Sequence, residues 1–203
     1  KAVIINEMAV PNKAVIIIKA EILTNNELLG ILNSKLMGFY VHKSTEKGKQ
    51  KLFPRISLTT VKNLPIYKPK TPQLNLSVEK VLSTSTKYEE RRIRFLKYIK
   101  SASTIDKFSR KLQSWHELTF AEFSKELNKA INSDNRQRRK DGVEELPQLT
   151  KKDEFEWMEL FEENKTKAVA LQQQITQTEK EIDQMVYELY GLTDEEIAIV
   201  ENS

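Results

Sequence analysis

The chain has 203 residues, of which 39% are hydrophobic and 31% charged, and its formal net charge is +4. This composition is ordinary for a globular protein that buries a core, and the length suits one large domain or two small ones. Cysteine is absent, which excludes disulfides and thiolate metal sites. No apolar run reaches the roughly 20 residues that a membrane span needs, so we expect a cytoplasmic protein without a membrane partner.

The positive charge is concentrated in the first part of the chain. Residues 1–76 contain 12 Lys and Arg against 4 Asp and Glu, whereas residues 77–203 contain 21 against 25. A basic module joined to an acidic helical one is typical of a nucleic-acid surface with a structural attachment. A small lysine-rich domain that binds no nucleic acid is the alternative.

The first predicted element is a β-hairpin over residues 2–23. Two β-branched runs flank a segment with Pro11 and Asn12, residues that favour a turn. Leu52–Leu58 is predicted to be a further strand, in which Pro54 indicates either a sheet edge or the first residues of the strand. Because the chain starts in an apparent strand without an initiator Met, we expect it to be the C-terminal piece of a longer polypeptide.

A helix is predicted from Asn25 to His42. Thr24 and Glu27 form a capping box at its start, and leucines follow at helical spacing. Gly30 and Gly38 each cost about 1 kcal/mol relative to alanine inside a helix. We therefore expect both glycines where the helix approaches the sheet closely.

The segment Ile66–Pro72 is the predicted domain boundary, because its prolines favour an extended connector. Beyond it, nearly every segment has the apolar spacing of a helix. The sequence therefore predicts an α+β fold in two domains. The first is a small, partial β-rich domain over residues 1–72, and the second is a mainly α-helical domain over residues 73–203, with long antiparallel helices.

The helical part is expected to contain helices over residues 77–100, 119–131 and 150–190, with a loop over 132–149. The last of these helices would be about 60 Å long. It carries an apolar residue at every seventh position, which predicts a coiled-coil-like seam. The seam consists of Phe161, Ala168, Ile175, Ile182 and Leu189. Either the helix over 77–100, in antiparallel register, or a second chain in a homodimer must cover it.

The sequence lacks motifs that would make this chain an enzyme by itself. It has no Asn-Pro-Pro-Phe/Tyr methylation motif, no glycine-rich cofactor loop and no convincing nuclease pattern of spaced carboxylates. His42 and His116 stand apart from other metal ligands, and Trp115 and Trp157 are interpreted as core residues. We therefore expect no catalytic residue, no cofactor and no metal in this chain.

The candidate DNA contacts lie in a polar loop around Gly48. Lysines on a loop can neutralise phosphates without demanding fixed geometry, and a glutamine can read adenine in the major groove. A solvated loop without DNA contact is the alternative. The predicted DNA-binding residues are Lys43, Lys47, Lys49, Gln50, Lys51 and Arg55.

Two further basic clusters receive a structural interpretation. The first, which precedes Asp141-Gly142, is predicted to be an exposed turn, with a grip on the DNA backbone as the alternative. It consists of Arg136, Arg138, Arg139 and Lys140. The second is predicted to face solvent or the acidic helix opposite, and it consists of Arg91, Arg92 and Arg94.

Three stretches resemble a single family. The tail Met185–Glu201 is similar to the "VYxLYGLTxEEIxIVE" ending of type II restriction-modification polypeptides that fuse an adenine methyltransferase to a DNA-specificity region. Leu28–Tyr40 resembles the "LLxxLNSxxxxFY" helix of target-recognition domains, and Phe53–Ile66 resembles the segment that closes the TaqI-like specificity region. Physically, the tail predicts a helix that ends at Gly191 and another that starts with a capping box at Thr193.

The resemblance implies a target-recognition fragment of a restriction-modification enzyme. Such a fragment binds double-stranded DNA and positions it for adenine-N6 methylation, with or without cleavage, by methyltransferase and nuclease domains of the same polypeptide. S-adenosylmethionine, and Mg²⁺ in a parent that cleaves DNA, would be bound by those domains. A helical protein–protein interaction or dimerisation scaffold without direct DNA binding is the alternative from another class.

Overall fold

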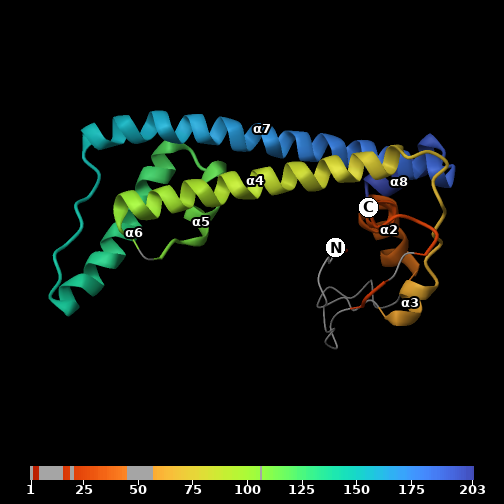
Figure 1. Cartoon of the computed structure of the whole chain (residues 1–203), viewed down its shortest axis with the longest axis horizontal. Helices are drawn as coiled ribbons and strands as arrows, with labels where there is room; N and C mark the ends of the chain where they lie inside the picture. Colours follow the sequence, from red (N-terminus) through yellow and green to blue (C-terminus); the bar gives the residue numbers. More distant parts are fainter. Residues whose placement is uncertain (1, 5–15, 19–20, 45–56, 106) are drawn as a thin grey trace. The chain divides into compact units, whose positions relative to one another are not determined.

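The computed structural model describes residues 2–4, 16–18, 21–44, 57–105 and 107–203. Helices make up 75% of these residues, which contain no strand (Figure 1). The elements are α1 (Asn25–Asn33), α2 (Lys35–Ser44), α3 (Leu58–Lys62), α4 (Gln73–Ser103), α5 (Arg110–Gln113), the 3-10 helix η1 (Trp115–Glu117), α6 (Phe120–Asp141), α7 (Lys151–Tyr190) and α8 (Asp194–Glu201). Among the described helices, none is long and apolar enough to cross a membrane.

The predicted α+β fold is therefore wrong for the described part of the chain, which is all-α. Most of the predicted hairpin and strand lies outside the described residues. At Ala2, the backbone N–H donates to the amide oxygen of Asn33 at 2.8 Å, and the Asn33 amide donates back to the Ala2 carbonyl at 3.0 Å. A side chain thus satisfies the backbone that a neighbouring strand would pair. Ser57 accepts from the N–H of Thr60 and starts α3, so that Leu58 is helical rather than the end of a strand.

The chain divides into two compact units. Unit 1 comprises Lys1–Ser83 and Ile175–Ser203, and unit 2 comprises Thr84–Gln174. Helices α4 and α7 contribute residues to both units. The predicted division into residues 1–72 and 73–203 follows the order of the chain instead, and it stays a prediction.

Unit 2 is built around an aromatic core. The rings of Phe123 and Phe161 stack with centroids 4.7 Å apart, and the ring of Phe95 lies 4.2 Å from that of Trp115. All four side chains are at most 3% exposed. Trp157 packs against the same core, so the interpretation of both tryptophans as core residues is confirmed.

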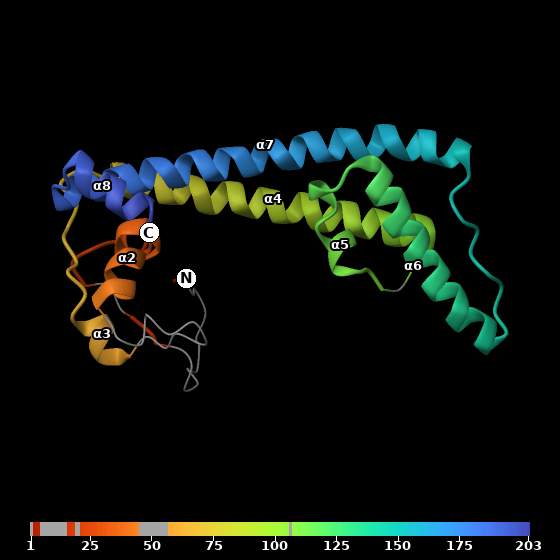
Figure 2. The ribbon, with the colours of Figure 1, turned by 180° about the vertical axis from the view of Figure 1, so that it is seen from behind.

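Helices α4 and α7 run antiparallel within unit 2, as both views show (Figures 1 and 2). Three pairs establish the register: Arg91 with Asn164, Phe95 with Phe161, and Tyr98 with Trp157. Phe161 and Ala168, two positions of the predicted seam, are fully buried. The prediction that an antiparallel helix of the same chain covers this part of the seam is confirmed.

Unit 1 has a smaller aliphatic core, to which α1, α2, the start of α4 and the end of α7 contribute. Its buried residues are Leu29, Ile31, Met37, Leu74, Val78, Ile182 and Val186. The predicted tail is confirmed: Gly191 has a φ of 68°, and Thr193 forms a capping box with Glu196 at the start of α8. The capping box of Thr24 and Glu27 is confirmed as well.

The helix predicted over residues 25–42 is wrong at one point, because it breaks at Ser34. The ψ of Ser34 is 153°, which is extended rather than helical. Its hydroxyl accepts from the N–H of Met37 at 3.2 Å, and a carboxylate oxygen of Asp183 accepts from the N–H of Lys35 at 2.8 Å. Both bonds satisfy N–H groups that the break leaves without a helical partner.

Helix α6 continues to Asp141, well into the predicted loop over residues 132–149. The buried amide of Asn135 makes two hydrogen bonds with the backbone of Leu146, at 2.9 and 2.7 Å. These bonds dock the following segment back onto the helix. Gly142 ends the helix in the left-handed conformation, with a φ of 67°.

The two glycines expected at close approaches differ from each other. A Cβ on Gly30 would lie 2.8 Å from a methyl carbon of Val78 and 3.1 Å from one of Leu74. A Cβ on Gly38 would meet nothing within 4 Å. The close approach is thus confirmed for Gly30, although the neighbour is a helix rather than a sheet, and it is wrong for Gly38.

Unit 2 buries one of the two histidines. His116 is 4% exposed, its Nε2 lies 2.5 Å from the Tyr88 hydroxyl, and its Nδ1 has no hydrogen-bond partner in the described part of the chain. Burial lowers the pKa of His116 below its usual value, because the charged imidazolium loses hydration there. The same burial raises the pKa of Tyr88.

The glycine pair provides a matched test of the packing of α1 on α4. We expect Gly30→Ala to lower the free energy of unfolding by about 1–3 kcal/mol, because the added methyl group overpacks the contact. Gly38→Ala should raise it by about 0.5–1 kcal/mol, because alanine favours the helix. Urea unfolding measures both changes. Stabilisation by both substitutions would contradict the close packing.

The buried histidine predicts a stability that depends on pH. The pKa of His116 is lower in the folded chain than the ~6.5 of an unfolded one, so the unfolded state binds more protons as the pH falls through that range. The contribution of His116 to the free energy of unfolding is therefore complete above about pH 6.5 and decreases below that pH. We expect the urea midpoint to fall from pH 7.5 to pH 5.5 and His116→Gln to flatten this dependence. The exposed His42 is the control: if His42→Gln flattened it instead, the assignment would be wrong.

Candidate nucleic-acid interface

The predicted phosphate-binding loop starts at the end of α2. Lys43 is the one predicted DNA-binding residue that the structure describes, and the other five lie outside the described residues: Lys47, Lys49, Gln50, Lys51 and Arg55. Lys43 is exposed in the last turn of α2, with its ammonium 5.6 Å from the ring centroid of Phe39. The ring and the negative end of the helix dipole both favour a cation there.

The beginning of α2 is anchored by α7 and α8. The N–H of Lys35 donates to Asp183, and its ammonium forms an ion pair with Glu201. The hydroxyl of Tyr187 donates to the same Glu201 carboxylate at 2.7 Å. Residues near the C-terminus therefore position the helix that leads into the candidate loop.

The electrostatics of this anchor commit Lys35 to structure rather than to phosphate binding. The hydrogen bond between the side chains of Lys35 and Glu201 raises the pKa of Lys35 and lowers that of Glu201. Burial raises the pKa of Asp183, although the N–H of Lys35 opposes this shift. Burial, together with the hydrogen bond to Glu201, also raises the pKa of Tyr187.

Sequence reasoning missed three exposed lysines of unit 1. They are Lys62, Lys68 and Lys70, and they form no ion pair with any described residue. The segment that carries the last two is held in place by Tyr190, whose hydroxyl donates to the Pro65 carbonyl and whose ring lies 5.1 Å from that of Tyr67. For Lys68 and Lys70, the alternation of lysine and proline in the sequence could have indicated an exposed basic segment.

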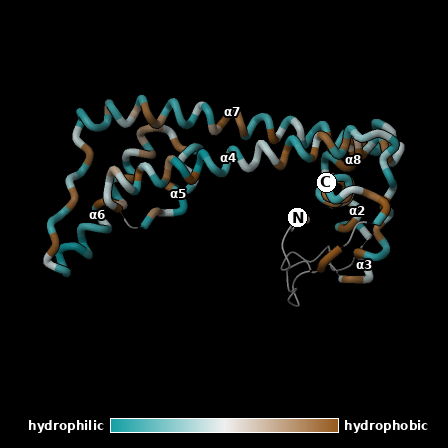
Figure 3. Tube along the Cα trace, in the orientation of Figure 1, coloured by the Kyte–Doolittle hydropathy of each residue, from teal (hydrophilic) through white to brown (hydrophobic). Residues whose placement is uncertain are grey.

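The second basic cluster is the end of a helix and not the predicted turn, because α6 extends through it. Figure 3 shows this end of α6 as hydrophilic. Arg138 pairs with Asp134 at 2.8 Å, and Arg139 pairs with Glu145 at 3.4 Å. Cations complement the dipole at the C-terminal end of a helix. Two of the four basic residues, Arg138 and Arg139, therefore form ion pairs that stabilise the end of α6 and the segment after it.

The third basic cluster is divided among several partners. Arg91 donates to the side chain of Asn164 on α7 at 3.3 Å. Arg92 pairs with Glu89 one turn earlier at 2.7 Å, and Arg94 is exposed. The predicted contact with the opposite helix therefore exists for Arg91, but its partner is an amide rather than a carboxylate.

The described residues do not form a recognisable metal or nucleotide site. Within them, no three His, Asp or Glu side chains are arranged to hold a metal ion. Three of the four described glycines have other uses: Gly30 packs under Val78, and Gly142 and Gly191 end helices with positive φ. The candidate interface therefore consists of the basic side chains described above.

Comparison with known proteins divides the chain into two segments. Residues 69–186 match a domain of unknown function, DUF8810, over more than half of the chain. The chain belongs to the DUF8810 family. Residues 3–66 match the TaqI-like C-terminal specificity domain. No curated protein and no solved structure matches the chain.

The resemblance inferred from the sequence is thereby confirmed for residues 3–66, here called the specificity domain. A domain of this family suggests a role in DNA target recognition. All six predicted DNA-binding residues belong to the specificity domain, as does Lys62. Lys68 and Lys70 lie just beyond its matched end.

The anchor of α2 can be tested by substitution at Asp183. We expect Asp183→Ala to lower the free energy of unfolding by about 1–3 kcal/mol, because the N–H of Lys35 loses its acceptor at a buried position. Asp183→Asn keeps an oxygen acceptor and should cost less. Lys35→Met is the control, with an expected cost below about 1 kcal/mol, because its ion pair is exposed. Equal costs for the alanine and asparagine variants in urea unfolding would contradict this role.

Proposed function

We propose that this chain is the DNA target-recognition part of a restriction-modification enzyme. It would position double-stranded DNA for adenine-N6 methylation by catalytic domains elsewhere in the same polypeptide. The observation that carries the proposal is the match of residues 3–66 to the TaqI-like specificity domain. Basic side chains would hold the phosphate backbone, and side chains of the loops would read the edges of the bases.

The charge distribution supports this function. Residues 1–76 hold 12 Lys and Arg against 4 Asp and Glu, so a polyanion is attracted to the segment that contains the specificity domain. Lys43 lies at the end of a helix whose other end is bound by Asp183 and Glu201. The candidate loop therefore starts from a fixed point, which favours a defined position on DNA.

The cofactors of such an enzyme would be bound outside this chain's described residues. S-adenosylmethionine supplies the methyl group in adenine methylation, and Mg²⁺ would serve a parent enzyme that also cleaves. Three of the four described glycines pack under side chains or end helices, and among the described residues no three His, Asp or Glu side chains are arranged to hold a metal ion. In this proposal the chain presents the target adenine, flipped out of the duplex, to a separate pocket.

A helical interaction scaffold is the second candidate function. A dimer through the predicted seam would have to displace α4, because Phe161 and Ala168 are already buried within one chain. The observation that favours a partner is a different one: Phe155 is 69% exposed and Met158 41% exposed, one turn apart on α7. Sedimentation of the wild type and of Phe155→Lys over a range of concentrations would reveal a dimer through this position.

The DNA-binding proposal predicts a salt dependence that belongs to the candidate loop. The test is a salt titration of binding to a random duplex, with the variant Lys43/Lys47/Lys49/Lys51→Ala beside the wild type. The logarithm of the binding constant should fall with the logarithm of salt concentration, and the slope should decrease by about 0.9 for every phosphate that the variant no longer neutralises. A flatter slope in this variant would support phosphate contacts from the loop.

A charge-matched variant controls for the removal of four positive charges. It replaces four exposed lysines of unit 2, which form no ion pair with any described residue: Lys97, Lys107, Lys125 and Lys152. We expect this variant to keep the wild-type slope. If both variants flattened the slope equally, the loop would have no special role, and if the wild type failed to bind DNA even at low salt, direct DNA binding by this chain would be ruled out.

A further inference from the structure

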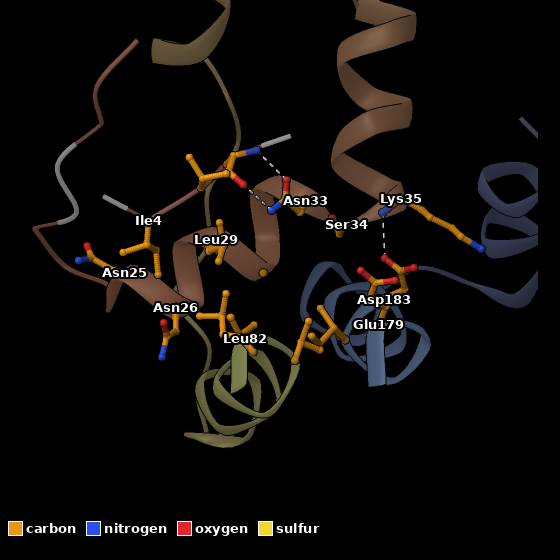
Figure 4. Close-up of a pocket in the computed structure, with 16 residues that line it drawn as sticks. Ile4, Asn25, Asn26, Leu29, Asn33, Ser34, Lys35, Leu82, Glu179 and Asp183 are labelled. Carbon is orange, nitrogen blue, oxygen red and sulfur yellow. Dashed lines mark hydrogen bonds between the residues drawn. The ribbon is translucent and has the colours of Figure 1, made fainter. Parts of the chain in front are cut away.

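Unit 1 contains a cavity of about 740 Å³ (Figure 4). It lies among α1, the early turns of α4 and the late turns of α7, and residues 2–4 form one side. Pockets that bind small ligands have volumes of roughly 300–1,000 Å³. The cavity is lined differently from the basic surface of the candidate interface, so it poses a separate question of function.

The walls of the cavity are mainly aliphatic. Leu29 of α1, Val78 of α4 and Ile182 of α7 line it, and each is less than 9% exposed. All three belong to the hydrophobic core of unit 1. The walls are therefore packed from behind, and they offer an apolar surface to the body of a ligand.

Residues 2–4 close one side of the cavity. Both hydrogen-bonding groups of the Ala2 backbone are held by the amide of Asn33, as the dashed lines in Figure 4 show. Ile4 adds a further apolar side chain to the lining. This side is thus attached to α1 by two hydrogen bonds.

One end of the cavity is acidic. Glu179 and Asp183, one turn apart on α7, both line it, and Figure 4 shows them across the cavity from Asn25 and Asn26. Neither carboxylate forms an ion pair with a lysine or arginine among the described residues. Lys35 also lines the cavity: its backbone N–H donates to Asp183, and its ammonium pairs with Glu201.

Asp183 is the more informative of the two carboxylates. It is 8% exposed, and one of its oxygens accepts the N–H of Lys35. Burial of a carboxylate beside an apolar wall is unfavourable unless a positive charge compensates it. Burial raises the pKa of Asp183, although the N–H and the positive charge of Lys35 oppose this shift.

We propose that this cavity binds an organic cation, namely an apolar chain that ends in an ammonium or guanidinium group. The chain would lie along Leu29, Val78 and Ile182, and the cation would bind Glu179 and Asp183. An anionic ligand such as a nucleotide or phosphate would be repelled by the same carboxylates. The site is therefore distinct from the proposed DNA surface, and it does not depend on that proposal.

The test uses three six-carbon probes that differ only in their head group. The ¹⁵N-labelled full chain is titrated with n-hexylammonium, 1-hexanol and n-hexanoate, and amide shifts are followed by NMR. We expect saturable shifts at the cavity residues with n-hexylammonium and affinity at least about tenfold higher than for n-hexanoate, because a charge-assisted hydrogen bond contributes more than ~1.4 kcal/mol. Equal binding of all three probes, or no saturable shift, would overturn the proposal.

Variants assign the recognition to the two carboxylates. Glu179→Gln alters an exposed residue and should leave the fold intact, and the double variant with Asp183→Asn should bind n-hexylammonium no better than 1-hexanol. The control is Glu188→Gln/Asp194→Asn, which removes two exposed carboxylates of unit 1 that do not line the cavity. If the control weakened binding as much as the double variant, the proposal would fail.

Two further probes distinguish the sources of such a cation. Spermidine represents a free amine, and the capped peptide acetyl-Leu-Leu-Lys-amide represents a side chain of a protein partner. If either probe binds more tightly than n-hexylammonium, the result supports the site and identifies the source of the cation. If neither probe binds, the proposal is overturned. Glu179→Gln, which leaves the anchor of α2 intact, should retain the salt dependence of DNA binding, so this result and that of the DNA titration can fail separately.

Discussion

The burial of the apolar stripe of α7 is the constraint on which the rest of the described structure depends. A helix of 40 residues cannot cover its own apolar face and needs a partner along its length. In unit 2 that partner is the later part of α4, where Phe95 meets Phe161. In unit 1 it is the earlier part of α4, where Val78 shares a core with Ile182. The shorter helices complete these two cores, α5 and α6 in unit 2 and α1 and α2 in unit 1.

Polar side chains then attach the non-helical segments to these cores. Asn33 holds the backbone of Ala2, and Asn135 holds that of Leu146, each through two hydrogen bonds from one amide. An amide can pair with a peptide group in this way because it presents one donor and one acceptor side by side. Asp183 acts similarly at the start of α2. Side chains thereby hold segments of the described chain that lie outside the helices.

The same arrangement separates the two proposed binding surfaces of unit 1. Lys43, Lys62 and Lys68 are exposed on the specificity domain and the segment after it. Asp183 of α7 and Glu201 of α8 anchor α2, and Glu179 and Asp183 of α7 line the cavity. A polyanion and a cation would therefore find different parts of one unit. This division gives the C-terminal helices a role in positioning the specificity domain, beyond the burial of their own apolar faces.

The sequence by itself determined the features that depend on residues within about one helical turn. These are the capping boxes at Thr24 and Thr193, the helix end at Gly191 and the apolar seam of α7, together with the family of residues 3–66. Only the tertiary structure decided the break at Ser34, the all-α character of the described residues and the acidic cavity. The physical reason is that these features depend on partners far apart in the sequence: the N–H freed at the break binds Asp183, and the Ala2 backbone binds Asn33 instead of a strand. Local patterns cannot reveal such partners, because only folding of the chain brings them together.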